Sequence, residues 1–281
     1  MAKCMENSTM KEKLKTYLQE KTKGPVAIAF SGGVDSAFLA WAACQVYEKV
    51  YAICIRTTLH PMRESEEAKA LAEKLGAEFV LLAVDEFAQA GIEENPIDRC
   101  YRCKRYMFES VKALAQEKGA QVVMDGTNAD DLKVYRPGVK ALKELGILSP
   151  LAELGITKAV VREQLASLGL AVASKPSTPC LATRFPYGTQ LTTEKLRRVD
   201  VAETYLHSLY QGNVRVREHE EAAKAAGSIR IARIEVDPEA QEQILAHRSD
   251  VCEQLLALGY DYVTMDLMGF ASGSMDKKIE K

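Results

Sequence analysis

The chain has 281 residues, of which 47% are hydrophobic and 27% charged, and its 37 basic and 39 acidic residues give a formal net charge of −2. These values are typical of a globular protein with one large or two ordinary domains, and they exclude global disorder and a charge signature of nucleic-acid binding over the whole chain. With no apolar signal core and no run near the roughly 20 apolar residues of a membrane span, we expect a cytoplasmic protein without nucleic-acid or membrane partners.

Strands and helices alternate over the first two thirds of the chain. A helix is expected over residues 10–21, then strands over 25–30, 50–55 and 78–84, and a fourth strand that runs into a polar turn within 121–131. Further helices are expected over 37–46, 65–76, 104–118 and 157–169. This alternation predicts a parallel sheet with helices on both faces, in which ligands bind beyond the carboxyl ends of the strands.

A different pattern follows the stretch 174–190, which is rich in Pro, Ser and Thr and predicts a loop at an active site and domain junction. Beyond it we expect a helix over 192–209, strands over 213–218 and 229–236, a helix over 238–258 and a last strand over 260–267. The segment 220–227 is interpreted as a helical or loose hairpin connection. The sequence therefore predicts an α/β domain over residues 1–185 and a smaller α+β domain over 186–281.

The stretch SGGVDS, residues 31–36, lies between the first strand and the following helix. A glycine pair there permits positive φ and the close approach of a ligand, and a helix N-terminus offers free N–H groups to an anion. The stretch lacks the lysine and the loop length of the Walker P-loop. The residues that can donate to a pyrophosphate are Ser31, Gly32, Gly33 and Ser36, and Asp35 can hold Mg²⁺.

This hexapeptide resembles the PP-loop of the ATP pyrophosphatase superfamily, whose members adenylylate a carbonyl or carboxylate oxygen and release pyrophosphate. An ordinary Gly-Gly turn is the alternative. Asp125, Gly126 and Thr127 stand where that superfamily keeps a turn that contacts the adenylate and the metal, and a purely structural turn is the alternative there.

Three of the seven cysteines stand out by their surroundings: Cys100 and Cys103 in RCYRCKRYMF, and Cys180 in TPCLATR. A CxxC at a helix start points two sulfurs one way, where the helix dipole favours thiolate. A zinc site lacks a fourth ligand, and the surrounding pattern does not fit a thioredoxin-like disulfide pair. The pattern is also compatible with two inert cysteines, or with three thiolates on an iron–sulfur cluster that has one open iron. An open iron could carry an extra sulfide to a substrate.

Several segments, taken in order, closely resemble the LarE family from about residue 20 to 268. They are SGGVDS, CYRCK, PCLATRFPYG, LTTEKLRRVDVAETYL and the strands VRVRE and ARIEV. These ATP-dependent sulfur transferases build the nickel-pincer nucleotide cofactor. The resemblance implies that ATP adenylylates a carboxylate of a pyridinium-3,5-biscarboxylic acid mononucleotide, and that sulfur then displaces AMP to leave a thiocarboxylate. It also implies the three-cysteine type, in which a 4Fe-4S cluster held by Cys100, Cys103 and Cys180 relays sulfide. Cys180 occupies the position of the sacrificial cysteine of other members, so sulfur donation by Cys180 itself stays open.

A substrate with a phosphate and two carboxylates is expected to bind arginine side chains, because guanidinium groups pair well with both anions. Arg184 and the pair Arg215 and Arg217, which share one face of a strand, are the candidates. Glu203 and Glu235 match acidic positions that the family places near a metal or phosphate pocket. A solvated surface is the alternative for each of them. The resemblance further implies that the second domain serves substrate binding or oligomerisation, and that the chain forms a homo-oligomer, as the family tends to form hexamers.

Three further function classes fit parts of the sequence. A tRNA-thiolating PP-loop enzyme is expected to have zinc modules or a basic face. An amide-forming synthetase uses ammonia rather than sulfur, so it gives the cysteines no role. A nucleotide-binding regulatory module needs the loop but not the cysteines. The sequence favours the sulfur transferase with ATP, Mg²⁺ and the cluster as cofactors, and with a sulfide or sulfur donor as partner.

Overall fold

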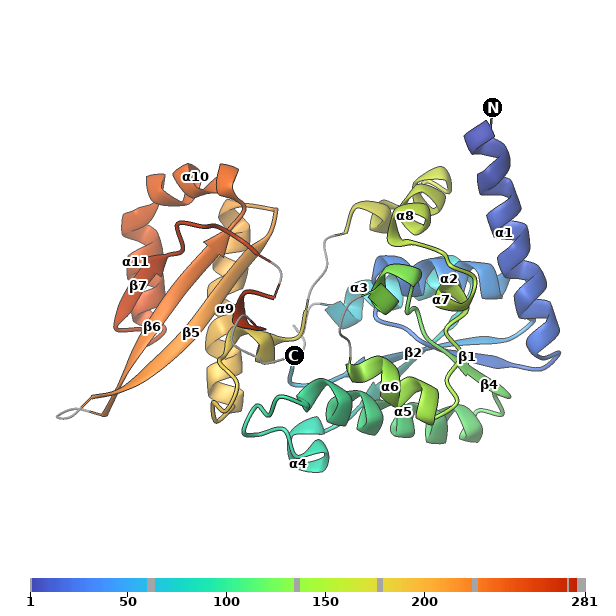
Figure 1. The fold of residues 1–281 in the computed structure, drawn as a ribbon, viewed down its shortest axis with the longest axis horizontal. Helices are drawn as coiled ribbons and strands as arrows, with labels where there is room; N and C mark the ends of the chain where they lie inside the picture. The colour runs from blue at the N-terminus through green and yellow to red at the C-terminus, as the bar shows by residue number, and fades with distance from the viewer. Residues whose placement is uncertain are drawn as a thin grey trace. The chain divides into compact units, whose positions relative to one another are not determined.

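The computed structural model describes residues 2–59, 64–133, 137–175, 179–223, 227–271 and 273–276 (Figure 1). The chain divides into two compact units. The first comprises Met1–Thr57, Met62–Ile92 and Asp98–Ser177, and the second comprises Thr58–Pro61, Glu93–Ile97 and Thr178–Lys281. Among the described residues, no helix has the length and apolar character needed to cross a membrane.

A four-stranded parallel sheet forms the centre of the first unit. Its strands β1 (Val26–Ala29), β2 (Val50–Arg56), β3 (Glu78–Ala83) and β4 (Val122–Met124) follow the order β3-β2-β1-β4. Val26 of β1 lies opposite Val50 on one side and Val122 on the other, so the carboxyl ends of β1 and β4 meet at one edge. The predicted parallel-sheet α/β fold is confirmed.

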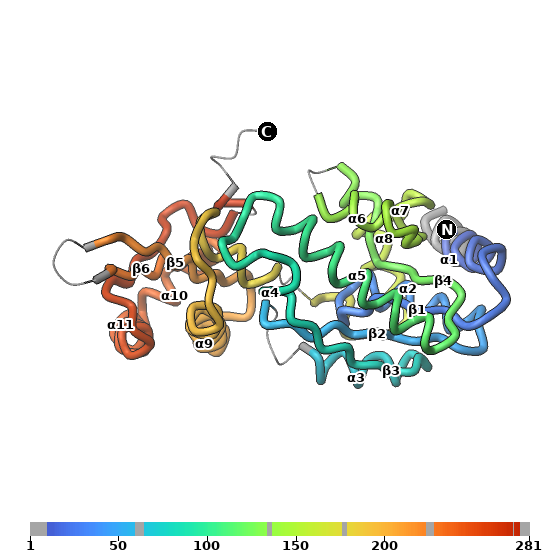
Figure 2. Tube along the Cα trace, turned by 90° about the horizontal axis from the view of Figure 1, so that it is seen from below, coloured from blue at the N-terminus to red at the C-terminus, as the bar shows by residue number. Residues whose placement is uncertain are grey.

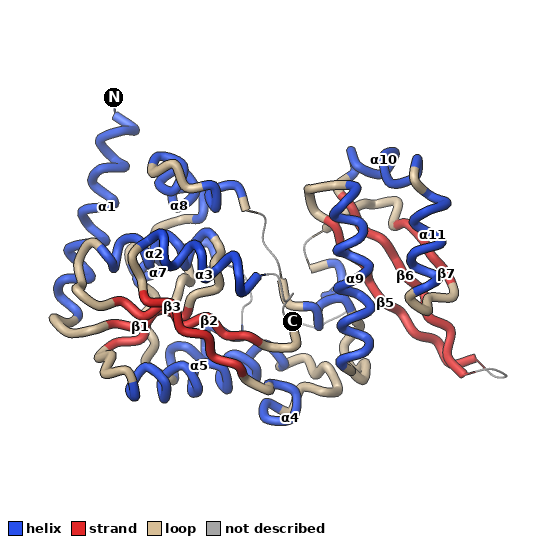
Figure 3. The backbone as a smooth tube through the Cα atoms, turned by 180° about the vertical axis from the view of Figure 1, so that it is seen from behind, coloured by secondary structure: helices blue, strands red, loops and turns tan. Residues whose placement is uncertain are grey.

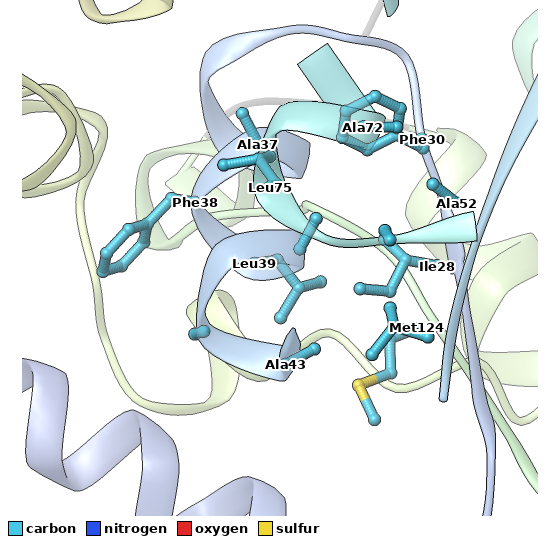
Figure 4. Packing of buried hydrophobic residues seen from close by; sticks show 14 of the residues in the cluster. Ile28, Phe30, Ala37, Phe38, Leu39, Ala43, Ala52, Ala72, Leu75 and Met124 are labelled. Atoms are coloured by element: carbon cyan, nitrogen blue, oxygen red, sulfur yellow. The ribbon is translucent and has the colours of Figure 1, made fainter. Parts of the chain in front are cut away.

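Helices cover both faces of this sheet, as Figures 1 and 3 show. Helices α2 (Val34–Cys44) and α3 (Glu64–Leu75) pack on one face, where Ile28, Phe30, Leu39 and Met124 form part of the main core (Figure 4). Helix α5 (Arg99–Glu117) packs on the other face. The remaining helical elements of the unit are α1 (Ala2–Lys21), α4 (Glu86–Ala90), η1 (Ala129–Lys133), α6 (Pro137–Glu144), α7 (Pro150–Glu153), α8 (Lys158–Ser167) and η2 (Ala171–Ser174).

The second unit is a three-stranded sheet covered by helices (Figures 1 and 2). Strands β5 (Val214–Ala223) and β6 (Gly227–Val236) are antiparallel, and β7 (Tyr262–Met265) lies parallel to β6. The helices are η3 (Leu181–Arg184), α9 (Thr193–Leu209), η4 (Pro238–Ala240), α10 (Gln241–Ala246), α11 (Arg248–Ala257) and η5 (Ser274–Asp276). A separate smaller sheet near the C-terminus is therefore present, as predicted.

Several predicted elements differ from the structure. The segment 220–227 is not helical: Glu220 pairs with Arg230 and Ala222 with Ser228, so both strands extend into it. The helix predicted over 238–258 is broken at His247, which ends α10 and precedes α11. Helix α1 starts before residue 10, and α5 begins at Arg99, so the CxxC lies in its first turns. Helices α4, α6 and α7 were not predicted because they are short, with 5, 8 and 4 residues.

Candidate functional site

The loop between β1 and α2 contains the residues predicted to bind pyrophosphate. Gly32 has φ +66°, and a Cβ added there would lie 2.8 Å from Cβ of Ala68 on α3, so only glycine fits without strain. The Ser36 hydroxyl donates to the Gly33 carbonyl at 3.1 Å and lies 3.3 Å from the Ser31 hydroxyl. Because α2 begins at Val34, its first N–H groups have no partner within the helix. Such a donor set suits a phosphate group.

The turn after β4 lies directly against this loop. A Cβ on Gly126 would lie 2.9 Å from the Ser36 nitrogen and 3.1 Å from the Asp35 carbonyl carbon. Asp125 is 4% exposed, and its carboxylate accepts hydrogen bonds from Ser149 Oγ at 2.6 Å and from Thr127 Oγ1. The structure thus brings the two predicted turns together at the carboxyl edge of β1 and β4.

Asp35 forms an ion pair that the sequence did not indicate. Lys158 Nζ, on the first residue of α8, donates to Asp35 Oδ2 at 2.8 Å. Asp35 Oδ1 is buried and has no hydrogen-bond partner among the described residues. A carboxylate oxygen in that position fits a hard cation such as Mg²⁺, which prefers oxygen ligands. Lys158 places a positive charge beside the proposed phosphate site.

Residues 128–131 connect the turn to the start of α8. The Asn128 side-chain oxygen accepts the Asp130 N–H at 2.9 Å, and Asp130 Oδ2 accepts the Lys158 N–H at 3.0 Å. The hydrogen bond from Lys133, and then the backbone N–H of Lys158, lower the pKa of Asp130. These bonds fix the backbone of Lys158 relative to the turn at 125–127.

The three cysteines of interest divide between the two units. Cys100 and Cys103 lie one turn apart on α5 of the first unit, where Cys100 is exposed and Cys103 half-buried. Cys180 lies in the second unit, half-buried, immediately before η3. In the described ranges no group of three or more His, Cys, Asp or Glu side chains is placed to hold a metal. The convergence of the three thiols therefore stays a prediction.

Two arginine–glutamate pairs of the second unit bind backbone carbonyls of the segment Cys180–Thr183. Arg184 is fully buried and donates to Glu203 through Nε at 2.9 Å and Nη2 at 2.8 Å, while its Nη1 donates to the Cys180 carbonyl at 3.1 Å. Burial lowers the pKa of Arg184, but the Glu203 carboxylate more than offsets this, so that pKa lies above its usual value. Arg217 donates to Glu235 Oε2 at 2.8 Å and to the Thr183 carbonyl at 2.9 Å.

Arg215 completes what we call the arginine cluster, consisting of Arg184, Arg215, Arg217, Glu203 and Glu235. Its guanidinium carbon lies 5.3 Å from the centre of the Phe270 ring. Burial, and then the neighbouring Arg184, lower the pKa of Arg215 to about 10. All five members are at most 6% exposed, so the solvated-surface alternative for them is wrong. Glu203 and Glu235 pair with Arg184 and Arg217, so the cluster has three cations and two anions, and its excess of one positive charge favours an anionic ligand.

Sequence reasoning missed Lys158, Ser149 and Thr183. Lys158 meets Asp35 across a separation of 123 residues, and no local pattern indicates such a contact. The one available signal was the position of Lys158 directly after the helix N-cap Thr157, which places it at the entry to α8.

Comparisons with known proteins agree with this geometry. The PP-loop domain family matches residues 6–133. Pyridinium-3,5-bisthiocarboxylic acid mononucleotide synthase of Lactiplantibacillus plantarum is 37% identical over 259 residues, which cover 91% of this chain and 90% of that protein. An uncharacterized protein of Synechocystis is 40% identical over 258 residues, covering 90% of this chain and 92% of its own length. A tRNA-specific 2-thiouridylase of Corynebacterium urealyticum is 28% identical over 187 residues, covering 54% of this chain and 46% of that enzyme.

Proposed function

Because this chain belongs to the LarE family of PP-loop enzymes, which includes pyridinium-3,5-bisthiocarboxylic acid mononucleotide synthase, we propose that it thiolates a carboxylate of pyridinium-3,5-biscarboxylic acid mononucleotide. The chain is an ATP-dependent sulfurtransferase. A carboxylate is a poor electrophile, so its oxygen first attacks the α-phosphorus of ATP, and pyrophosphate leaves. Sulfur then attacks the carbonyl carbon of the acyl adenylate, and AMP leaves with the electrons of the broken C–O bond.

The observation that carries this proposal is the approach of Gly126 to the backbone of Asp35 and Ser36. It supports one nucleotide site formed by the loop after β1 and the turn after β4. In that site the N–H groups at the start of α2 and the Ser31 and Ser36 hydroxyls would bind the leaving pyrophosphate. Asp125, Gly126 and Thr127 would contact the adenylate.

Asp35 is the residue that would hold Mg²⁺, through the buried oxygen that has no hydrogen-bond partner among the described residues. Bound Mg²⁺ would neutralise charge that develops on the pyrophosphate. Lys158 would also neutralise charge on the pyrophosphate. Its ammonium group lies 2.8 Å from Asp35 and would bind an adjacent phosphate oxygen when Mg²⁺ binds Asp35.

Cys100, Cys103 and Cys180 would hold the 4Fe-4S cluster, whose uncoordinated iron would bind a sulfide from an external donor. Cysteine thiolates are the usual ligands of iron–sulfur clusters, so three cysteines have suitable donor atoms. The positions of Cys100 and Cys103 in successive turns of α5 place both sulfurs on one face of that helix.

Donation of sulfur by Cys180 itself is the second candidate. Its favouring observation is that Cys180 lies in the same unit as the arginine cluster, with its carbonyl bonded to Arg184. In this route the Cys180 thiolate displaces AMP to give a thioester. Loss of the Cα proton to a base then breaks the Cβ–S bond, leaving the thiocarboxylate and dehydroalanine at position 180.

The anionic groups of the substrate would bind at Arg184, Arg215 and Arg217, with Glu203 and Glu235 holding Arg184 and Arg217 in place. We also propose that the chain forms a homo-oligomer and that the second unit serves substrate binding or assembly. Gel filtration of the purified chain against a monomer standard tests the assembly.

The decisive experiment incubates the chain anaerobically with ATP, Mg²⁺ and the mononucleotide, with and without iron and sulfide reconstitution, and follows thiocarboxylate by mass spectrometry. Sulfide-dependent turnover that is lost in Cys100→Ser and Cys103→Ser supports the cluster route. A single turnover with loss of one sulfur from Cys180, and no effect of Cys100→Ser, favours the second candidate. Thiolation of added tRNA in place of the mononucleotide overturns the assignment.

A further inference from the structure

A short segment from the first half of the chain is part of the second unit. Glu93–Ile97 belong to the second unit, although the residues on both sides of them belong to the first. We call residues 93–97 the anchor segment. It is followed at once by Asp98, the N-cap of α5, so the chain passes from this segment into the helix that carries the CxxC.

The side chain of Asn95 attaches the anchor segment to the loop between η3 and α9. Asn95 is fully buried, and its Nδ2 donates to the Phe185 carbonyl at 3.3 Å and to the Pro186 carbonyl at 2.8 Å. The Asn95 carbonyl in turn accepts the Gly188 N–H at 3.1 Å. This one residue therefore binds the backbone of the loop at three positions.

The backbone of the anchor segment fits this role. Asn95 has φ +47°, a left-handed conformation that asparagine tolerates better than most residues. An amide nitrogen also supplies two N–H donors, one for each carbonyl that Asn95 binds. A second attachment lies nearby, because the Leu191 N–H donates to the Glu93 carbonyl at 2.7 Å.

The anchor segment is close along the chain to both cysteine positions. The bonded Phe185 directly follows Arg184, whose Nη1 donates to the Cys180 carbonyl at 3.1 Å. On the other side, Cys100 follows Asn95 by five positions, so their Cα atoms are at most about 18 Å apart. The hydrogen bonds of Asn95 therefore limit how far Cys100 can move from the loop that follows Cys180.

We propose that Asn95 is a positioning residue for the three thiols. By holding the anchor segment on the loop after Cys180, it keeps Cys100 and Cys103 within reach of Cys180. This inference rests on the proposed function, in which the three thiols hold one cluster. A short connection of this kind raises the effective concentration of one thiol at another, and the gain falls as the connection lengthens.

The test is cross-linking of Cys100 to Cys180 in the full chain, with a short bismaleimide and peptide mass spectrometry. All variants carry Cys103→Ser, so that one thiol of the CxxC reacts. Asn95→Gly removes the side-chain donors and keeps a residue that readily adopts positive φ. It should lower the yield of the cross-link, relative to single modification of Cys100, at least about fivefold. Glu94→Gln is the matched control, because Glu94 is the exposed neighbour of Asn95, and its yield should equal that of the parent.

A second variant lengthens the connection and leaves Asn95 unchanged. Three glycines inserted between the exposed residues Ile97 and Asp98 add about 10 Å of reach. They should lower the yield of the cross-link at least about twofold. This variant alone decides the question if Asn95→Gly does not fold.

Urea unfolding of each variant separates positioning from stability. If Asn95 had only a structural role, Asn95→Gly would lower the unfolding midpoint and leave the cross-link yield of the folded chain unchanged. That result overturns the proposal, as do a parental yield in the insertion variant and the absence of the cross-link in the parent.

Thiocarboxylate formation by the chain with its full set of cysteines distinguishes failure of this inference from failure of the proposed function. If the yields fall as expected but that chain forms no thiocarboxylate, the proposed function alone is overturned. If it forms thiocarboxylate and the yields are equal in all variants, the role of Asn95 alone is overturned.

Discussion

Arg184 and Glu203 form a two-point ion pair inside the second unit, with Nε to Oε1 at 2.9 Å and Nη2 to Oε2 at 2.8 Å. Glu203 Oε1 also accepts the Val216 N–H of β5 at 2.8 Å. One carboxylate therefore connects the short helix that follows Cys180 to α9 and to the backbone of β5. The position of Cys180 depends on this pair, because Arg184 also bonds the Cys180 carbonyl.

Replacement of Glu203 by Gln should destabilise the second unit substantially. The change leaves the Arg184 charge buried without its carboxylate, and breaking a buried pair in this way costs about 3 to 5 kcal/mol of unfolding free energy. Urea unfolding monitored by circular dichroism measures the loss. Glu242→Gln is the matched control, because Glu242 is exposed on α10 and should stay within about 0.5 kcal/mol of the parent. A loss below about 1 kcal/mol for Glu203→Gln would contradict the structural role of the pair.

The contact between Gly126 and the PP-loop leads to a prediction about ATP. In Gly126→Ala, the new Cβ would lie 2.9 Å from the Ser36 nitrogen, so the loop and the turn must separate. Since both segments would contact the same nucleotide, ATP affinity should fall at least about tenfold, which is about 1.4 kcal/mol. Isothermal titration calorimetry with ATP and Mg²⁺ measures this affinity. Gly119→Asn serves as control, because Gly119 has φ +74° with open space around it, and Asn tolerates that conformation. Equal ATP affinity for Gly126→Ala and the parent would argue against a shared nucleotide site.

Lys158 should affect ATP binding through its charge. Lys158→Gln removes a cation that lies 2.8 Å from Asp35, at the place where the triphosphate would gather negative charge. A charge-assisted hydrogen bond is worth about 1.5 to 3 kcal/mol, so the KM for ATP should rise about tenfold or more. Initial rates of pyrophosphate release against ATP concentration give this KM. Lys118→Gln, at the exposed C-cap of α5, should leave this KM unchanged. A KM within twofold of the parent for Lys158→Gln would exclude direct contact with the nucleotide.

Much of the first unit follows from local sequence because its strands are short apolar runs, of which β1 and β2 are largely buried. The predicted strands 50–55 and 78–84 match β2 (Val50–Arg56) and β3 (Glu78–Ala83) within one residue at each end. The break between α10 and α11 could not be predicted in the same way. His247 interrupts the helix with φ −100° and ψ 17°, yet neither Gly nor Pro marks the position in the surrounding residues AHRSD.

The candidate site was only partly accessible from sequence. The PP-loop could be found because its six residues are contiguous, and their local order sets the turn and the helix start. Lys158 could not, because its contact with Asp35 depends on how α8 packs against α2, a helix far away in the sequence. The burial of Arg215 and Arg217 was also hidden, since strand alternation places them on one face but does not say what covers that face.

Cys44 and Cys100 should differ strongly in their reaction with iodoacetamide. Burial raises the pKa of the Cys44 thiol to about 11, because the thiolate is poorly solvated beside the core. At pH 8 only about one in 10³ of its molecules is then a thiolate, and the thiolate is the form that reacts. Cys100 is exposed on α5, so it should be alkylated within minutes at pH 8 while Cys44 stays unmodified. Peptide mass spectrometry of the folded chain measures alkylation at both cysteines.

Raising the pH toward 10 should increase the rate of Cys44 alkylation roughly tenfold per pH unit. Alkylation of Cys44 in guanidinium at pH 8 is the control for access. Equal rates at pH 8 in the folded chain would show that the Cys44 thiol is not held in its neutral form by burial.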